Sequence, residues 1–154
     1  MANFMSALDK PMDEIERPKP VPTGTYVGQI VGLPVAKEVT TKDGDKETMD
    51  VQIKIVSSMQ IDNPDALSEY GDISTARPLR RTFWFSKPAT PDELWAFKQF
   101  CTNVLKIETA GKTMKQVAAE MQGKQLVITV TQNTYTDKSG DPVVGNNISG
   151  TAAL

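Results

Sequence analysis

The sequence predicts a mainly β fold, a five-stranded barrel with a helix between the third and fourth strands. Three observations support this prediction. Runs rich in β-forming residues, with apolar side chains at alternate positions, occur on both sides of one block with helical periodicity. The helical block opens with a capping pattern, and turns containing glycine and aspartate separate the strand-like runs. The order of three strands, a helix and two strands predicts a barrel.

The first two strands lie on either side of a turn at residues 42–45. The run at 24–35 is rich in β-formers, and its two internal glycines suit a strand that coils sharply at a barrel corner. Residues 49–56 alternate apolar and polar side chains, which indicates a strand with one buried face. Residues 60–77 carry several carboxylates, Pro64 and Gly71, so a long loop is expected before the third strand at 79–85.

A helix begins after Thr90, because this N-cap threonine is followed by Pro91 and, three positions on, by Glu93. Apolar residues then recur at helical spacing, and the interpretation is that they cover the core. These apolar residues are Leu94, Trp95, Phe97, Phe100, Cys101, Val104 and Leu105. A similar cap at Thr113 predicts a short helix that stops at Gly123. Residues 126–131 and the final run to 154 form a hairpin around a turn at 137–141.

The chain divides into an arm, residues 1–22, and one barrel domain, residues 23–154. The arm has an apolar start and an acidic stretch, and it ends in alternating prolines that favour an extended linker. A flexible terminus is the first interpretation. In the alternative, the apolar tip at Phe4, Met5 and Leu8 packs on a neighbouring copy, which would make the protein a homo-oligomer.

Composition excludes several classes of function. The chain contains no histidine and a single Cys101, so an internal disulfide, a Cys/His zinc site and a Cys-His catalytic pair are excluded. Gly111-Lys112-Thr113 resembles the end of a phosphate-binding loop, but Lys106 stands where that motif needs glycine. Neither a cofactor nor a metal ion is expected. The carboxylates of the 60–77 loop are the remaining route to catalysis, and a solvated loop explains them, so no enzyme activity is expected.

No apolar run approaches the ~20 residues that span a bilayer, and the first residues do not resemble a secretory signal, so a cytosolic protein without a membrane partner is expected. The net charge of −2 means that any nucleic-acid site must be a local basic patch. The third strand supplies one: if Leu79, Phe83 and Phe85 point inward, the opposite face carries Arg80, Thr82 and Trp84. An exposed tryptophan beside arginine suits base stacking and phosphate binding.

The main candidates for nucleic-acid contacts lie on this strand. Secondary candidates lie on neighbouring strands and in the loops that flank the barrel groove. They are Trp84, Arg80, Arg81, Arg77, Lys54, Tyr26 and Tyr135. Arg81 falls on the inward side near the strand end. An alternative remains open, in which Trp84 is buried under the helix and the arginines are ordinary solvated charges.

A helix between strands three and four of a five-stranded β protein is the plan of the oligonucleotide-binding (OB) fold. Within about residues 20–154, the chain resembles bacteriophage single-stranded DNA-binding proteins, in segments 22–26 (PTGTY), 81–85 (RTFWF), 90–101 and 121–130 (MQGKQLVITV). The resemblance implies a protein that coats single-stranded DNA during replication or recombination, with replication or recombination proteins as partners, in the cytoplasm of the infected bacterial host. Many such proteins end in an acidic tail, which this chain lacks. The alternative function is a phage virion or assembly component, such as a decoration or tail protein.

Overall fold

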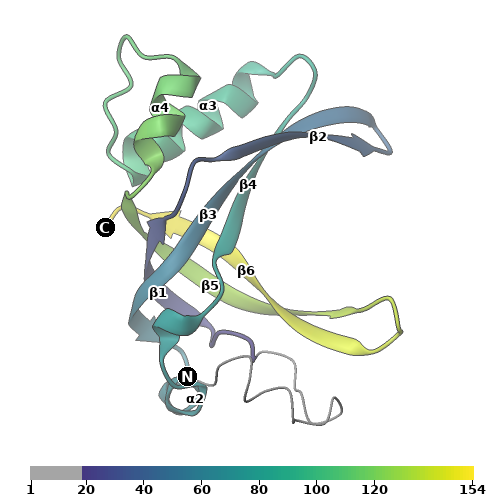
Figure 1. The fold of residues 1–154 in the computed structure, drawn as a ribbon, viewed down its shortest axis with the longest axis vertical. Coiled ribbons are helices and arrows are strands. Elements are labelled where there is room, and N and C mark those ends of the chain that lie inside the picture. The colour runs from purple at the N-terminus through teal and green to yellow at the C-terminus, as the bar shows by residue number, and fades with distance from the viewer. Residues whose placement is uncertain (1–18) are drawn as a thin grey trace, which may run out of the picture.

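The structure, a computed structural model, describes residues 19–154 and shows a mainly β protein with α3 and α4 at one end of the sheet and α2 at the other (Figure 1). The described strands are β1 (Gly24–Ile30), β2 (Val35–Thr41), β3 (Gly44–Ile61), β4 (Leu79–Phe85), β5 (Gln125–Thr136) and β6 (Pro142–Ala152). The described helices are α2 (Pro64–Tyr70), α3 (Pro91–Gln99) and α4 (Met114–Met121), with a 3-10 turn η2 (Ile73–Thr75) and a π-helical turn η3 (Phe100–Val104). The helical block predicted between strands three and four therefore lies between β4 and β5.

All strand pairs in the described sheet are antiparallel, and the long β3 organises it. The first part of β3 pairs with β2, its middle with β4, and its second part with β1. On the far side of β1 lie β5 and then β6. The strands β4 and β6 are not joined by a ladder, so the described residues form an open sheet, and the structure does not show the closed barrel that the sequence predicts.

The described sheet has six strands, so the prediction of five is wrong. The first predicted strand, 24–35, divides because Gly32 adopts a left-handed φ of 72° and Pro34 has no amide proton to donate. The chain leaves the sheet there and returns as β2. Gly28, the other internal glycine, permits a close approach of β1 to β3: a Cβ at this position would lie 2.5 Å from Cγ2 of Ile53. The predicted loop at 60–77 also contains α2, which Asn63 caps, and η2.

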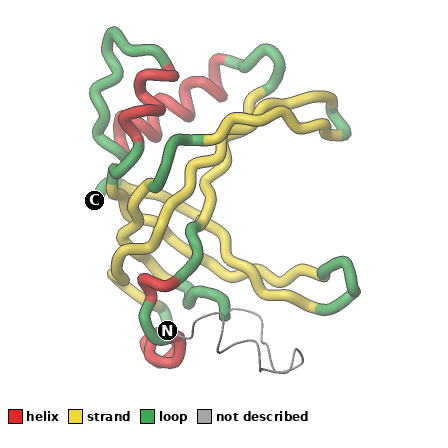
Figure 2. Tube along the Cα trace, viewed as in Figure 1, coloured by secondary structure: helices red, strands yellow, loops and turns green. Residues whose placement is uncertain are grey.

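Two hairpins project from the body of the sheet and give the molecule the outline of a letter C (Figures 1 and 2). The β2–β3 hairpin forms one end of the C and the β5–β6 hairpin forms the other. The helices α3 and α4 lie at the end of the sheet next to the β2–β3 hairpin. No described helix is long and apolar enough to cross a lipid bilayer.

The hydrophobic core combines buried side chains of β1, β3, β4 and β5 with those of the helical block and also includes Val21 and Ala76. Phe83 of β4 makes edge-to-face contacts with Phe97 and Phe100, whose ring centroids lie 5.3 Å and 5.2 Å from its own. Such aromatic pairs add about 0.5–1.5 kcal/mol each beyond their burial. Phe83 and Phe85 are buried as predicted, whereas Leu94 and Trp95 are exposed rather than part of the core-facing side of α3.

The ordered domain begins earlier than predicted. Val21 and Pro22, which the sequence assigns to the arm, are buried. The Val21 amide donates to Asn146 Oδ1 at 2.8 Å, and the Val21 carbonyl accepts from the side-chain amides of Gln132 and Asn146. The predicted boundary is therefore about two residues too late, because distant polar side chains satisfy the backbone here. The rest of the proposed arm, up to residue 18, lies outside the described residues.

Candidate functional site

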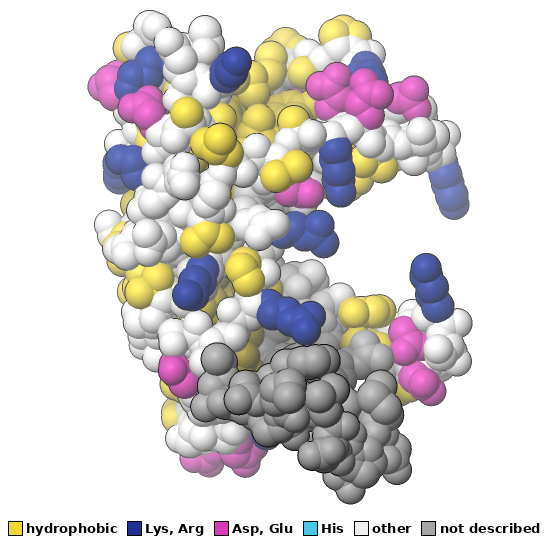
Figure 3. Space-filling model, viewed as in Figure 1, with side chains coloured by type: hydrophobic (Ala, Val, Ile, Leu, Met, Phe, Trp, Pro, Cys, Tyr) yellow, Lys and Arg dark blue, Asp and Glu magenta, His cyan; other side chains and the backbone are white. Residues whose placement is uncertain are grey.

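A cleft of about 820 Å³ lies between the β2–β3–β4 face and strands β5 and β6. In the space-filling view, Lys and Arg side chains surround a hollow between the β2–β3 and β5–β6 hairpins (Figure 3). The cleft is lined from one side by Lys37, Val39, Thr48, Asp50, Pro78, Leu79, Arg80, Arg81, Thr82 and Trp84, and from the other by Thr131, Asn146, Asn147, Ile148 and Ser149. Its lining is thus mainly polar, with one large aromatic ring.

The register of β4 determines which of its side chains enter the cleft. Alternate residues of a strand point to opposite faces, so the burial of Phe83 and Phe85 turns Trp84 toward solvent. Trp84 is 50% exposed, which contradicts the alternative that it is buried under the helix. Arg80, on the same face, has a side chain that is 62% exposed.

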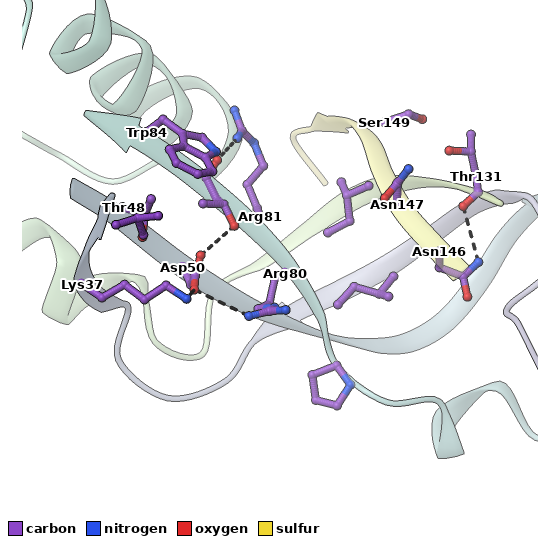
Figure 4. A pocket seen from close by; sticks show the side chains of 15 residues that line it. Lys37, Thr48, Asp50, Arg80, Arg81, Trp84, Thr131, Asn146, Asn147 and Ser149 are labelled. Carbon is purple, nitrogen blue, oxygen red and sulfur yellow. Dashed lines mark hydrogen bonds and ion pairs between the residues drawn. The ribbon is translucent and has the colours of Figure 1, made fainter. Parts of the chain in front are cut away.

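A buried carboxylate, Asp50, lies in the wall of the cleft (Figure 4). Its Oδ1 accepts a hydrogen bond from Thr82 Oγ1 at 2.6 Å. Its Oδ2 lies 3.6 Å from Lys37 Nζ and 3.8 Å from Arg80 Nη1. Sequence reasoning missed Asp50 and Lys37. The alternation of β3 places Asp50 on the polar face, but only the pairing of β3 with β2 and β4 reveals its neighbours.

Arg81 is held differently from Arg80, on the inward side as predicted. Its guanidinium carbon lies 4.3 Å from the centre of the Phe83 ring, and Nη1 donates to the Thr82 carbonyl. Burial lowers the pKa of Arg81 from its usual value. No carboxylate of the described residues is within ion-pair distance of it. Arg81 also lines a smaller space of about 210 Å³ beside residues 148–151 of β6, in the gap between the two unjoined strands.

Thr48 is directly opposite Trp84 in the β3–β4 ladder and opposite Lys37 in the β2–β3 ladder. Its side chain is almost completely buried, yet the hydroxyl has no hydrogen-bond partner among residues 19–154. An unsatisfied buried polar group costs about 1–3 kcal/mol. This unsatisfied group lines the cleft beside the exposed indole.

A second cleft, of about 460 Å³, adjoins the first, since Leu79 and Asn146 line both. It contains Arg77 and Tyr135, two of the residues predicted from sequence, together with Lys19. The side chain of Tyr135, on the β5–β6 hairpin, is 51% exposed. Five of the seven predicted residues therefore line two contiguous clefts.

The other two predicted residues are elsewhere. Tyr26 is fully buried, and its hydroxyl donates to the Pro22 carbonyl at 2.5 Å, so its ring is not available to stack on a base. Burial, together with nearby Tyr70, raises the pKa of Tyr26 to about 12. The prediction for Tyr26 is wrong because Tyr26 lies on the core-facing side of β1, where alternate residues of the strand are buried. Lys54 is exposed but pairs with Gln29 of β1 and lines neither cleft.

Within residues 19–154, no cluster of three or more Cys, Asp or Glu side chains has the arrangement of a metal site. Neither a model of a known protein family nor a curated protein matches this chain.

Proposed function

We propose that this protein binds single-stranded DNA in the two contiguous clefts and, encoded by a phage, coats exposed strands during replication or recombination in the host cytoplasm. The observation that carries the proposal is the half-exposed Trp84 in a cleft with Lys37, Arg80 and Arg81. An exposed ring stacks on any base, and nearby cations neutralise phosphates. Tyr135 is a second stacking residue, in the adjoining cleft.

The strand order supports the proposal, because we interpret the open sheet as an OB-type barrel. In this interpretation β1 and β2 together are the first strand, interrupted at Gly32, and β3, β4, β5 and β6 are the second to fifth. The order then runs outward from β1 through β3 to β4, and through β5 to β6, with the helices between β4 and β5. OB folds bind oligonucleotides on the second and third strands, between the loops that connect strands one to two and four to five. In this interpretation, the first cleft lies at that position, because β3 and β4 line it.

The stacking contact can be measured by tryptophan fluorescence, but the chain has two tryptophans and Trp95 is also exposed. The titration therefore uses the Trp95→Phe variant, in which Trp84 is the sole reporter. Oligo-dT and a duplex of equal length are added at two salt concentrations. Saturable quenching by oligo-dT, weaker at high salt and absent with duplex, is the expected result. No response to either ligand at low salt would refute the proposal.

A matched pair of variants tests whether the stacking is at Trp84. Trp84→Ala should weaken binding of every single-stranded sequence by about 5–150-fold, because one stacked base contributes about 1–3 kcal/mol. Trp95→Ala is the control, since Trp95 lies on α3 outside both clefts. Binding is followed by fluorescence anisotropy of a labelled oligonucleotide. An equal loss of DNA affinity in Trp84→Ala and Trp95→Ala would argue against a stacking role for Trp84.

A second candidate function is a phage virion or assembly component, which the exposed apolar side chains of the helical block favour. Leu94, Trp95 and Met114 are each at least 39% exposed. Leu94 and Met114 line two neighbouring hollows of about 360 Å³ and 530 Å³. Assembly into large oligomers in solution, combined with an absence of DNA binding, would support this function over the first.

A further inference from the structure

The two oxygens of the Asp50 carboxylate have different environments. Oδ1 accepts the short hydrogen bond from Thr82. Oδ2 has two cationic neighbours at ion-pair distance, Lys37 and Arg80, but it receives no hydrogen bond from any described residue. The side chain is only 9% exposed. An ionised carboxylate is an acceptor at both oxygens, so Oδ2, although ion-paired, can still accept a hydrogen bond from a ligand in the cleft that Asp50 lines (Figure 4).

This acceptor lies close to the exposed indole. Asp50 pairs with Thr82, and Trp84 is the next residue on the same face of β4. Diagonal neighbours of this kind are separated by roughly 7–8 Å between Cα atoms, within reach of long and aromatic side chains. Thr48, whose hydroxyl has no partner among the described residues, is directly opposite Trp84 and two residues from Asp50 along β3. Trp84, Asp50 and Thr48 are therefore neighbours in one part of the cleft lining.

We propose that Asp50 determines base preference in this cleft: a base stacked on Trp84 donates its exocyclic amino group to Asp50 Oδ2, so that oligo-dC and oligo-dA bind more tightly than oligo-dT. The inference rests on the proposed function, because it assumes that a strand occupies the cleft. It adds a specificity that stacking and phosphate contacts alone do not provide, since those contacts accept every base.

The preference follows from the hydrogen-bonding groups of the bases. Cytosine and adenine carry an amino group, at N4 and N6, where thymine carries the acceptor O4. An amino group can donate a hydrogen bond to the carboxylate. Thymine O4 cannot, because it is itself an acceptor, and the two oxygens repel each other. A site with a buried polar group discriminates against a ligand that leaves that group unpaired. Lys37 and Arg80 flank the carboxylate from two different strands, which holds it in place.

A simpler role for Asp50 makes a different prediction. If the carboxylate only offsets the charge of Lys37 and Arg80, its removal strengthens the binding of all oligonucleotides by the same factor. The ratio of Kd for oligo-dT to Kd for oligo-dC separates the two roles, because an unspecific charge effect cancels from it.

The experiment measures this ratio by fluorescence titration in the Trp95→Phe background, with oligo-dC, oligo-dA and oligo-dT of equal length at one salt concentration. We expect a ratio of at least about tenfold, which corresponds to about 1.4 kcal/mol, near the lower limit for one hydrogen bond to a charged group. Asp50→Asn should bring the ratio close to one, because the amide offers a donor to thymine O4. Asp45→Asn is the charge-matched control: Asp45 is exposed on the β2–β3 hairpin, lines neither cleft, and its substitution should leave the ratio unchanged.

Each result has one meaning. A ratio near one in the parent protein overturns the inference without using any variant, and so does a ratio that Asp50→Asn leaves unchanged. In both cases saturable binding would leave the proposed function intact. If none of the three oligonucleotides binds, the proposed function fails, and the base preference fails with it. Circular dichroism of Asp50→Asn, compared with the parent, verifies that the variant is folded.

Discussion

At the scale of single residues, Thr48 is the described side chain with the clearest energetic cost. Its hydroxyl is buried and unpartnered. Thr48→Val replaces that hydroxyl with a methyl group of similar shape, so the free energy of unfolding should rise, by about 1 kcal/mol or more. Urea unfolding measures the change. Thr82→Val is the contrasting control, because it removes the hydrogen bond to Asp50 and should lower stability. A destabilised Thr48→Val would indicate that the hydroxyl is satisfied.

Arg80 combines two roles at the same scale, as counter-ion of Asp50 and as a phosphate ligand. Because its side chain is largely exposed, it can turn from Asp50 toward a phosphate. Arg80→Ala should therefore make the slope of log K against log salt less negative by about 0.7, the contribution of one phosphate contact to a single strand. Lys54→Ala is the control, since Lys54 is exposed outside the clefts. An unchanged slope for Arg80→Ala would leave Arg80 only the first role.

At the scale of elements, the start of α3 depends on Glu93, which joins the helix to the end of β4. Its carboxylate accepts hydrogen bonds from the Thr90 and Ser86 amides at 2.8–3.0 Å. These bonds lower the pKa of Glu93 from 4.5 to about 2. The pKa is lower in the folded state, so the stabilisation is fully present above pH 4.5 and is lost as the pH falls toward 2.

Glu93→Ala tests this linkage. The variant should be less stable than the parent at neutral pH, because the capping box and the connection to Ser86 are removed. The difference in free energy of unfolding should narrow between pH 4.5 and 2, as the parent loses the same interactions by protonation. Urea unfolding at a series of pH values gives the difference. A constant difference over this range would show that the carboxylate charge does not contribute.

At the scale of the whole molecule, the clefts are basic although the chain as a whole is acidic. Lys37, Arg80 and Arg81 line the first cleft, and Lys19 and Arg77 line the second. If three to five of these cations contact phosphates, the slope of log K against log salt should be roughly −2 to −3.5 for single-stranded DNA. Titrations of oligo-dT over a range of salt concentrations measure it. A slope near zero would mean that phosphate contacts do not drive binding.

Local sequence determined most of the elements of this protein. Both helix starts were predictable because the caps at Thr90 and Thr113 are contacts within four residues. The face of β4 was predictable because strand alternation is a local property, and with it the exposure of Trp84. The interruption at Gly32 and Pro34 was visible in the residues, but the return of the chain as β2 depends on its pairing with β3.

Only the tertiary structure decided how these elements form a site. Asp50 meets Lys37 and Arg80 because three strands come together at β3, and a pairing register between distant segments cannot be inferred from one strand's alternation. Burial of Tyr26 follows from which side of β1 faces the core, and that side is set by packing between distant segments. The sequence by itself thus determined the mainly β class, the helix caps and the exposed face of β4, all of which depend on local contacts. The strand count, the open sheet and the composition of the clefts depend on contacts between residues far apart in the chain, and these contacts exist only in the folded structure.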